Sequence, residues 1–273
     1  DIDPYDEHTG KGVLRHIIGR IGQSGWMIIL VTATEQLPYK EKWVEKLTER
    51  IPQVETIVHN VNSKRTNVIL GPKNNILYGD GTITDHIKDL QFTLSPHSFF
   101  QVNPEQTTVL YDQALEYADL KGDETVIDAY CGTGTISLFL AHKAKHVIGI
   151  EIVEPAIINA RENAQRNGYD NTEFIVADAA VEMPKLYKAG VRPDVIVFDP
   201  IRAGCKEEVL TSAAGMEPKR IVYVSCNPAT MARDIEILTH YGYELQEVQP
   251  VDMFPMTAHV EAVALLTRNE VTQ

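Results

Sequence analysis

The chain has 273 residues, enough to bury a substantial core in one large domain or two modest ones. No apolar stretch approaches the roughly 20 residues of a membrane helix, and three cysteines are too few for a disulfide framework, so we expect a cytoplasmic protein. The net charge of −13 argues against a nucleic-acid partner, because proteins that bind phosphates usually present basic surface.

Residues 1–92 predict a small α+β domain. Alternating apolar residues predict strands over 13–21 and 26–34, joined by a turn at 22–25. Trp43, Val44 and Leu47 have helical spacing and predict a helix over 40–50. Strands over 54–61 and 66–70 are expected to follow, with a turn at 62–65 between them. No segment of this part resembles a catalytic motif.

Residues 93–273 alternate between strand and helix patterns, which is typical of a parallel sheet covered by helices. The predicted strands are 125–128, 146–150, 172–177, 194–198, 220–225, 244–250 and 260–267. The predicted helices are 136–142, 154–167, 206–214 and 231–241. The fold class is therefore α/β, and we expect ligands beyond the carboxyl ends of the strands, as in other sheets of this kind.

A glycine-containing loop, residues 128–135 (Asp-Ala-Tyr-Cys-Gly-Thr-Gly-Thr), lies between a predicted strand and a predicted helix. Gly132 and Gly134 allow a sharp turn and a close approach of the backbone to a ligand. Glu151 ends the next strand, where an acid can accept hydrogen bonds from ribose hydroxyls. Asp178 ends the third strand and could meet an adenine amino group. These positions predict a nucleoside-containing cofactor.

The residues around the glycines favour a methyltransferase over a dinucleotide oxidoreductase. An oxidoreductase would want a third glycine near Ser137, and none is present. Asp128 and Tyr130, before the glycines, fit a methyltransferase better, although Tyr130 has an alternative interpretation as a core residue. For Glu151 the alternative is an acid at a helix start, stabilised by the helix dipole.

Three further strand ends carry the residue types that methylation of a pyrimidine carbon needs. Carbon 5 of uracil is a poor nucleophile until a thiolate adds to carbon 6, and a base must later remove the carbon 5 proton. Cys226 is the candidate nucleophile and Glu261 the candidate base. Arg202 could stabilise negative charge or lower the thiol pKa.

Each of these residues has an alternative interpretation. Cys226 could be a small apolar residue after a buried strand, although Asn-Pro directly after it forces a turn that exposes the thiol. Cys131 and Cys205 are rival thiols, the second at a predicted helix start where the dipole could lower its pKa. Glu261 could be a solvated strand acid, and His259 is a second candidate base with a structural role as its alternative.

Five segments of the sequence resemble the RNA uridine-5-methyltransferases, which make 5-methyluridine in ribosomal and transfer RNA. The segments are 98–103 (Ser-Phe-Phe-Gln-Val-Asn), 128–134, 199–204 (Asp-Pro-Ile-Arg-Ala-Gly), 225–228 (Ser-Cys-Asn-Pro) and 259–261 (His-Val-Glu). Together they span about residues 96–268, and their combination is highly specific. Residues 12–16 and 59–62 resemble the central domain of the ribosomal RNA branch.

The resemblance implies a Rossmann-like S-adenosylmethionine-dependent methyltransferase domain over 93–273, preceded by a small α+β central domain over 1–92. It implies methylation of a uridine in RNA, with 23S rRNA favoured over tRNA. The three cysteines all lie within 93–273, so we expect no metal site in this chain, and the lack of a long apolar stretch predicts no membrane association. By the same resemblance Cys226 would be the nucleophile and Glu261 the proton acceptor. The cofactor and target-base pocket would be lined by Gln101, Tyr130, Glu151 and Asp199, with Asp178 beside them.

Two departures from the family pattern matter. Ile201 stands where the family usually has a second proline, which puts the shape of that loop in doubt. Full-length relatives carry an N-terminal RNA-binding barrel, many with a cysteine-ligated iron–sulfur cluster, and neither is visible here. Because the chain opens on Asp1 rather than Met, we expect a fragment without that basic module. Otherwise basic residues must gather on one face; the candidates are Lys11, Arg15, Arg20, Lys64 and Arg65.

Two other functions stay open on the sequence. The first is methylation of a nitrogen or of a small molecule, which needs no covalent thiol. The second is a cofactor-binding RNA chaperone or assembly factor without catalysis.

Overall fold

The structure is a computed structural model that describes residues 2–269. The chain divides into two compact units, residues 1–98 and 99–273. This boundary lies six residues after the one placed from the sequence. It does so because strand β6 (Leu90–Leu94) pairs with β5 (Ile83–Ile87) in an antiparallel hairpin that belongs to the first unit.

The first unit contains a four-stranded sheet in the order β1-β2-β3-β4. Its strands are β1 (Leu14–Ile21), β2 (Trp26–Thr32), β3 (Val54–Val61) and β4 (Lys73–Tyr78). The central pair β2 and β3 is parallel, and the outer pairs are antiparallel. Helix α1 (Lys40–Arg50) connects β2 to β3, and its Trp43 and Leu47 pack against a core that includes Leu30 and Ile57.

The predicted strand over 66–70 is wrong, because these residues form a loop and the strand begins at Lys73. The Asn62 side chain bonds the carbonyls of Val68 and Ile69, at 2.7 and 3.0 Å. Asn60 exchanges two hydrogen bonds of 2.8 Å with the backbone of Gly71. Side-chain amides thus bond backbone groups that would otherwise pair with a neighbouring strand.

The second unit is built on a seven-stranded sheet in the order β12-β13-β11-β10-β7-β8-β9. Its strands are β7 (Thr125–Ala129), β8 (His146–Glu151), β9 (Thr172–Val176), β10 (Val195–Phe198), β11 (Arg220–Ser225), β12 (Tyr243–Val251) and β13 (Glu261–Arg268). Strands β11, β10, β7, β8 and β9 are parallel to one another. Strands β12 and β13 form an antiparallel edge, so the expectation of a parallel sheet holds for five of seven strands.

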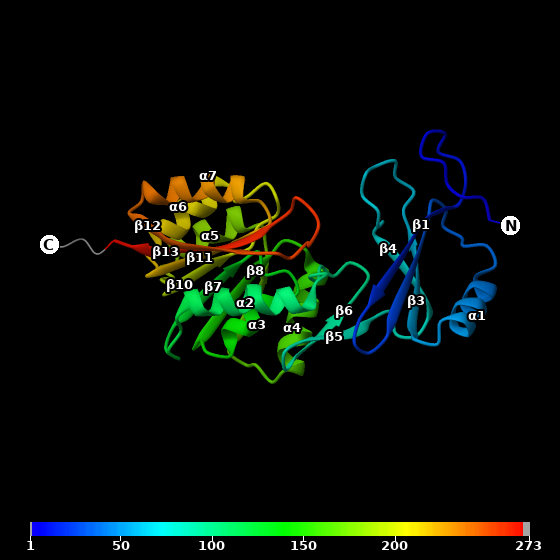
Figure 1. The fold of residues 1–273 in the computed structure, drawn as a ribbon, viewed down its shortest axis with the longest axis horizontal. Helices are drawn as coiled ribbons and strands as arrows, with labels where there is room; N and C mark the ends of the chain where they lie inside the picture. Colours follow the sequence, from blue (N-terminus) through cyan, green and yellow to red (C-terminus); the bar gives the residue numbers. More distant parts are fainter. Residues whose placement is uncertain (1, 270–273) are drawn as a thin grey trace. The chain divides into compact units, whose positions relative to one another are not determined.

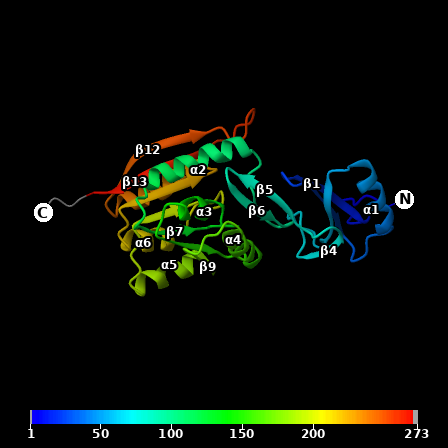
Figure 2. The same cartoon turned by 90° about the horizontal axis from the view of Figure 1, so that it is seen from below.

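Helices cover both faces of this sheet (Figure 1). One face carries α2 (Pro104–Ala118), α3 (Thr135–Ala141) and α4 (Glu154–Arg166). The other carries α5 (Ala179–Lys188), α6 (Glu207–Gly215) and α7 (Pro228–Thr239). Helix α2 runs along β11 and β13 (Figure 2). This arrangement of layers is a Rossmann-like α/β fold, the fold class predicted from the sequence.

Two helices of the second unit were not predicted. Helix α2 begins with the N-cap Asn103 and with Pro104 in its first turn, both ordinary start signals. Helix α5 contains Pro184 in its interior, a residue that normally ends a helix, which explains why the sequence did not predict it. Within residues 2–269, no helix combines the length and the apolar character needed to cross a membrane.

Candidate active site

The candidate site lies at the carboxyl ends of the parallel strands. Strand β7 runs into the glycine loop and β8 ends at Glu151. Asp199 directly follows β10, and Cys226 directly follows β11. Glu261 begins β13, which runs antiparallel to β11 and pairs Ala262 with Ser225. The topology therefore brings these predicted site residues to one edge of the sheet.

The glycine loop has a backbone that ordinary residues rarely adopt. Gly132 and Gly134 have φ angles of 55° and 81°, and Tyr130 has a φ of 91°. A Cβ on Gly134 would lie 3.1 Å from the Ala160 Cβ, so helix packing explains that glycine. A Cβ on Gly132 would meet no atom within 4 Å. Packing does not explain Gly132, which borders open space where a ligand can approach.

Glu151 is positioned by the glycine loop. Its Oε2 accepts a hydrogen bond of 3.3 Å from the Gly132 backbone N–H, and its Oε1 accepts one of 2.9 Å from Val153 N–H. The second bond goes to the residue before α4, whose start has no side-chain cap, so it is not a cap of that helix. The first connects the carboxylate to the glycine that borders open space, which fits a ligand-facing role.

Asp128 is buried with an incomplete set of partners. Its Oδ2 accepts a 2.5 Å hydrogen bond from Ser137 Oγ, while Oδ1 has no partner among the described residues. Burial raises the pKa of Asp128 to about 7, and the charge of Glu151 adds to the rise. A buried oxygen without a donor, beside the glycine loop, fits a polar ligand in this position.

Asp178 and Tyr130 have protein partners of their own. Asp178 caps α5, with Oδ1 accepting a 2.9 Å bond from Ala180 N–H, and its Oδ2 pairs with Lys206 Nζ at 2.9 Å. The bond from Lys206 lowers the pKa of Asp178. Tyr130 is partly buried and packs against the core. For both residues the structure shows these contacts, and contact with a cofactor stays a prediction.

The three thiols differ in accessibility. Cys131 and Cys205 are 5% and 6% exposed, whereas Cys226 is only partly buried. Burial raises the pKa of the Cys131 thiol well above its usual range and that of Cys205 to about 12. Cys205 Sγ also lies 3.5 Å from the Tyr223 hydroxyl oxygen. Both rivals are core residues, and of the three cysteines only Cys226 is partly exposed.

Charged groups surround the Cys226 thiol. Its pKa is raised by partial burial and by the negative charge of Glu261 and Asp199, while the positive charge of Arg202 lowers it. Glu261 is 3% exposed, and burial raises its pKa against the opposing effect of Arg202. Burial, with Glu261 and Asp128, raises the pKa of Asp199 well above its usual range. Glu261 is therefore a buried group beside the thiol and no solvated strand acid.

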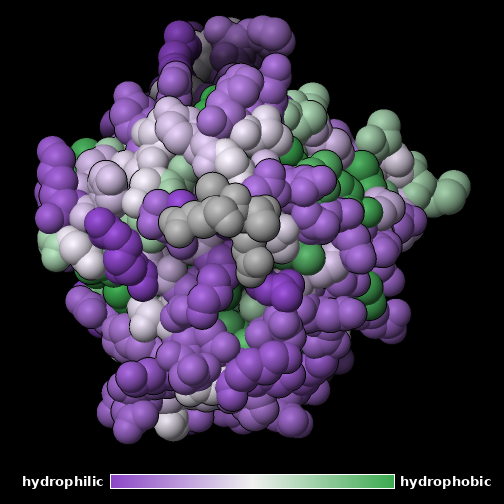
Figure 3. Space-filling view, turned by 90° about the vertical axis from the view of Figure 1, so that its left-hand side faces the viewer, coloured by the Kyte–Doolittle hydropathy of each residue, from purple (hydrophilic) through white to green (hydrophobic). Residues whose placement is uncertain are grey.

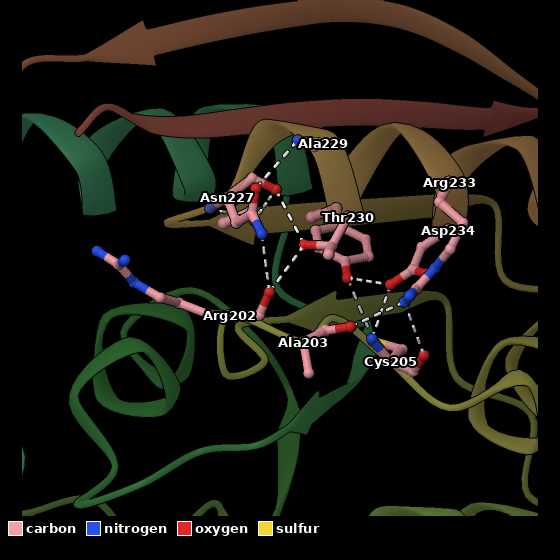
Figure 4. A network of polar contacts seen from close by, with 10 residues as sticks. Arg202, Ala203, Cys205, Asn227, Ala229, Thr230, Arg233 and Asp234 are labelled. Atoms are coloured by element: carbon pink, nitrogen blue, oxygen red, sulfur yellow. Dashed lines mark hydrogen bonds and ion pairs between the residues drawn. The ribbon is translucent and has the colours of Figure 1, made fainter. Parts of the chain in front are cut away.

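The loops that carry Arg202 and Cys226 are joined by hydrogen bonds (Figure 4). The Arg202 carbonyl accepts bonds of 3.0 Å from Asn227 Nδ2 and 3.2 Å from Thr230 Oγ1. The Arg202 side chain points away from this network in Figure 4 and donates to His259 Nδ1 at 3.2 Å. His259 thus has a structural partner, which agrees with the structural alternative considered for it.

A buried acid on α7 anchors the other end of the 199–205 loop. Asp234 is 0% exposed, and its Oδ2 accepts hydrogen bonds from the Tyr223 hydroxyl at 2.5 Å and from Cys205 N–H at 2.7 Å. Arg233 donates to Asp234 Oδ1 and to the Ala203 carbonyl (Figure 4). Sequence reasoning missed this cluster.

A signal for that cluster was present in the sequence. Met231, Ile235 and Leu238 form the buried stripe of α7, and Asp234 occupies a position on the same stripe. An acid at a core position of an amphipathic helix needs buried partners, because an unpaired buried charge is very unfavourable.

Gln101 lies in the segment that leads into α2. Its side chain is 8% exposed, so it is a buried polar group, as a pocket residue would be. Two residues later, Asn103 Nδ2 donates a 3.3 Å bond to the Met253 carbonyl, which ties this segment to the loop before Glu261.

A cleft of about 650 Å³ lies at the other, amino-terminal ends of β10 and β11. Its lining includes Lys219 and Asp194, which form a 3.0 Å ion pair, and Arg268, which pairs with Glu217. This end of the unit, which carries the last residues of β13, is mostly hydrophilic (Figure 3). The charged side chains that line this cleft neutralise one another in ion pairs, and none of the predicted site residues lines it. This cleft is therefore not the candidate site.

Comparisons with known proteins agree on one family. The sequence matches the family described as tRNA (Uracil-5-)-methyltransferase over residues 27–269. Uncharacterised RNA methyltransferases of Halalkalibacterium halodurans and Clostridium acetobutylicum are 56% and 53% identical over 96% and 98% of this chain. The chain spans 58% and 59% of the lengths of these relatives. The structure of Pyrococcus abyssi tRNA (uracil-54, C5)-methyltransferase in complex with S-adenosyl-L-homocysteine matches with a TM-score of 0.80 at 31% identity, covering 97% of this chain and 63% of that chain.

Proposed function

Because the chain belongs to the tRNA (uracil-5-)-methyltransferase family, we propose that it methylates carbon 5 of a uridine in RNA, with S-adenosylmethionine as the methyl donor and Cys226 as covalent nucleophile. The observation that carries this proposal is the partial exposure of Cys226, whose thiol pKa responds to the buried Glu261 and to Arg202. The other two thiols of the chain are buried in the core.

The residues at the glycine loop fit S-adenosylmethionine. The open space at Gly132 and the unpartnered Asp128 oxygen support a nucleoside ligand here. Glu151 would hold the ribose and Gln101 would lie beside the target base. S-adenosylmethionine, when bound, supplies an electrophilic methyl group on a positively charged sulfur. Burial of Asp128, Asp199 and Glu261 at the same sheet edge suits a ligand with that charge.

In the proposed reaction Cys226 loses its proton to solvent and its sulfur bonds to carbon 6 of the uracil ring. The electrons of the carbon 5–carbon 6 double bond move toward the carbonyl oxygen at carbon 4, and carbon 5 becomes nucleophilic. Arg202 stabilises the negative charge. After carbon 5 has been methylated, Glu261 takes its remaining proton, the double bond re-forms and the Cys226 sulfur leaves.

The raised pKa of Glu261 suits its proposed role as proton acceptor. A carboxylate whose pKa lies nearer to neutrality is a stronger base than an exposed one. Glu261 lies at the start of β13, where its neighbour Ala262 pairs with Ser225, the residue before Cys226. The backbone pairing of β13 with β11 therefore holds Glu261 near Cys226.

RNA that carries 5-fluorouridine tests the mechanism. Fluorine at carbon 5 cannot leave as a proton, so the wild type should form a stable covalent RNA complex that requires S-adenosylmethionine. Cys226→Ala should form none, whereas Cys205→Ala, the matched control at a buried thiol, should form it. Glu261→Gln should trap the adduct on ordinary uridine, because proton removal is blocked. Full methyl transfer by Cys226→Ala would refute the covalent mechanism and favour a non-covalent methyltransferase.

The identity of the RNA is a separate part of the proposal. The resemblance of residues 12–16 and 59–62 to the ribosomal RNA branch favours 23S rRNA. The P. abyssi enzyme is named for tRNA, and tRNA is therefore the second candidate. Tritium release from carbon-5-labelled uridine in each RNA, mapped to position, distinguishes them. Cofactor binding without release from either RNA would favour a non-catalytic RNA chaperone.

A further inference from the structure

The first unit contains a long stretch without any acidic residue. Asp and Glu together number 38 in the 273 residues, yet none occurs between Thr56 and Gly79. The same stretch contains Lys64, Arg65 and Lys73. In a chain with a net charge of −13, this stretch carries no acid of its own. Glu7 and Glu35, from other segments, pair with Arg15 and Lys73 beside it, so Lys64 and Arg65 are the cations there that could attract a polyanion.

The loop in the middle of that stretch, residues 62–71, is fixed by buried polar side chains. Asn60 and Asn62 are 0% and 3% exposed and bond the backbone of Gly71, Val68 and Ile69. On the other side, Arg15 Nη1 donates to the carbonyls of Asn62 and Lys64, at 2.9 and 2.7 Å. Gly71 closes the loop so tightly that a Cβ there would lie 1.8 Å from the Val61 carbonyl oxygen.

These hydrogen bonds also show which basic side chains are engaged within the unit and which could contact a ligand. The Arg15 side chain is 1% exposed and pairs with Glu7, and Arg20 donates to the Ser98 carbonyl. Neither can serve as an open basic residue. Lys64 and Arg65 are exposed, and no ion pair within residues 2–269 involves either of them.

The loop also exposes apolar side chains next to these charges. Val68 is 63% exposed and Ile69 is 48% exposed. Cations beside exposed apolar groups, on a backbone that is already ordered, match the chemistry of a strand with phosphates and unstacked bases. Because the loop is preformed, binding would not require it to become ordered.

We propose that the 62–71 loop is an RNA-docking surface, with Lys64 and Arg65 on phosphates and with Val68 and Ile69 against unpaired bases. This inference rests on the proposed function for the identity of the anion. The occupant is RNA rather than a protein because an acid-free stretch in an acidic chain is explained by charge complementarity to a polyanion. The exposed face of α1, by contrast, mixes lysines with acids such as Glu45 and Glu49.

The test measures the salt dependence of binding to a radiolabelled 23S rRNA transcript. Lys64→Gln with Arg65→Gln should weaken binding about tenfold and reduce the magnitude of the slope of log K against log salt by about 1.4–1.8, two phosphate contacts. The matched control, Lys42→Gln with Lys46→Gln, removes the same charge from α1 of the same unit and should leave the slope unchanged. Val68→Ala with Ile69→Ala should weaken binding without changing the slope.

The outcomes separate this inference from the proposed function. If the wild type binds the transcript but releases no tritium from it or from tRNA, the function fails while the slopes still test the loop. If both charge variants change the slope equally, or neither does, the loop is not a docking surface for RNA. Thermal unfolding of each variant shows whether the fold is retained, since the hydrogen bonds of Asn60 and Asn62 are untouched.

Discussion

We expect the buried Asp234 carboxylate to position the 199–205 loop. Its removal should therefore change the pKa of the Cys226 thiol indirectly, through this loop. A Cβ on Gly204, which has a φ of 78°, would lie 2.5 Å from Asp234 Oδ2, so the loop is packed directly onto this carboxylate. Replacement of Asp234 therefore releases the segment that carries Arg202. Because Arg202 lowers the pKa of Cys226, a displaced Arg202 should let that pKa rise.

The magnitude follows from the partners of Asp234. Asp234→Ala leaves the Tyr223 hydroxyl and the Cys205 N–H buried without an acceptor, and it should lower the free energy of unfolding by about 3–5 kcal/mol. Asp234→Asn can keep its oxygen toward these two donors and turn its amide toward Arg233. The Arg233 side chain is 52% exposed and can turn to water, so the loss should be about 1–3 kcal/mol.

Two buried tyrosines provide the matched comparison. Tyr223 donates to Asp234, and Tyr243 donates a 2.8 Å bond to the Pro218 carbonyl at the other end of the sheet. Replacement of either by Phe should cost about 1 kcal/mol, measured by urea unfolding. Only Tyr223→Phe and Asp234→Asn should also shift iodoacetamide alkylation of Cys226 to higher pH. An alkylation profile that is unchanged in Asp234→Asn would refute the positioning role.

Two further predictions concern the thiol and the glycine loop. Because Glu261 raises and Arg202 lowers the pKa of Cys226, Glu261→Gln should shift its alkylation profile to lower pH and Arg202→Gln to higher pH; equal profiles would contradict the arrangement. Gly132→Ala and Gly168→Ala place a Cβ at φ angles of 55° and 75° with no atom within 4 Å, so each should cost about 1–2 kcal/mol in unfolding experiments. Only Gly132→Ala should weaken S-adenosylhomocysteine binding by calorimetry, and equal binding would remove the loop from the cofactor site.

The regular helices and strands could be predicted because the spacing of apolar residues is visible within a short stretch of sequence. Strand β11 and helix α1 begin and end where the pattern placed them. The 66–70 segment has the composition of a strand, but the Asn62 amide bonds the carbonyls of Val68 and Ile69, and Asn60 bonds the backbone of Gly71 directly after the segment. These contacts come from residues on β3 and directly after it, which the local pattern of 66–70 does not contain.

The candidate site, too, has features that the sequence predicted and features that only the structure provides. The strand ends predicted Cys226 as a site residue because the carboxyl ends of parallel strands converge. Glu261 comes to the same end of the sheet because it begins the antiparallel strand β13, which pairs with β11. Burial decided what the sequence left open: it removed Cys131 and Cys205 as rival thiols and removed the solvated alternative for Glu261. Exposure of a side chain depends on how whole layers pack, so spacing along the chain could not provide it.

Net charge does not by itself argue against the proposed RNA partner, because it is a sum over positions that face different surroundings. Asp128, Asp199 and Glu261 are gathered at one sheet edge, where burial, together with the charges of Glu261 and Asp128, raises the pKa of Asp199. A cationic ligand placed among them would favour their ionised forms and be held by them. The acid-free stretch of the first unit, with Lys64 and Arg65 unpaired, offers the opposite surroundings. An acidic chain can therefore hold a cation in its pocket and still present a separate surface to phosphates, since each ligand responds only to charges within about 10 Å.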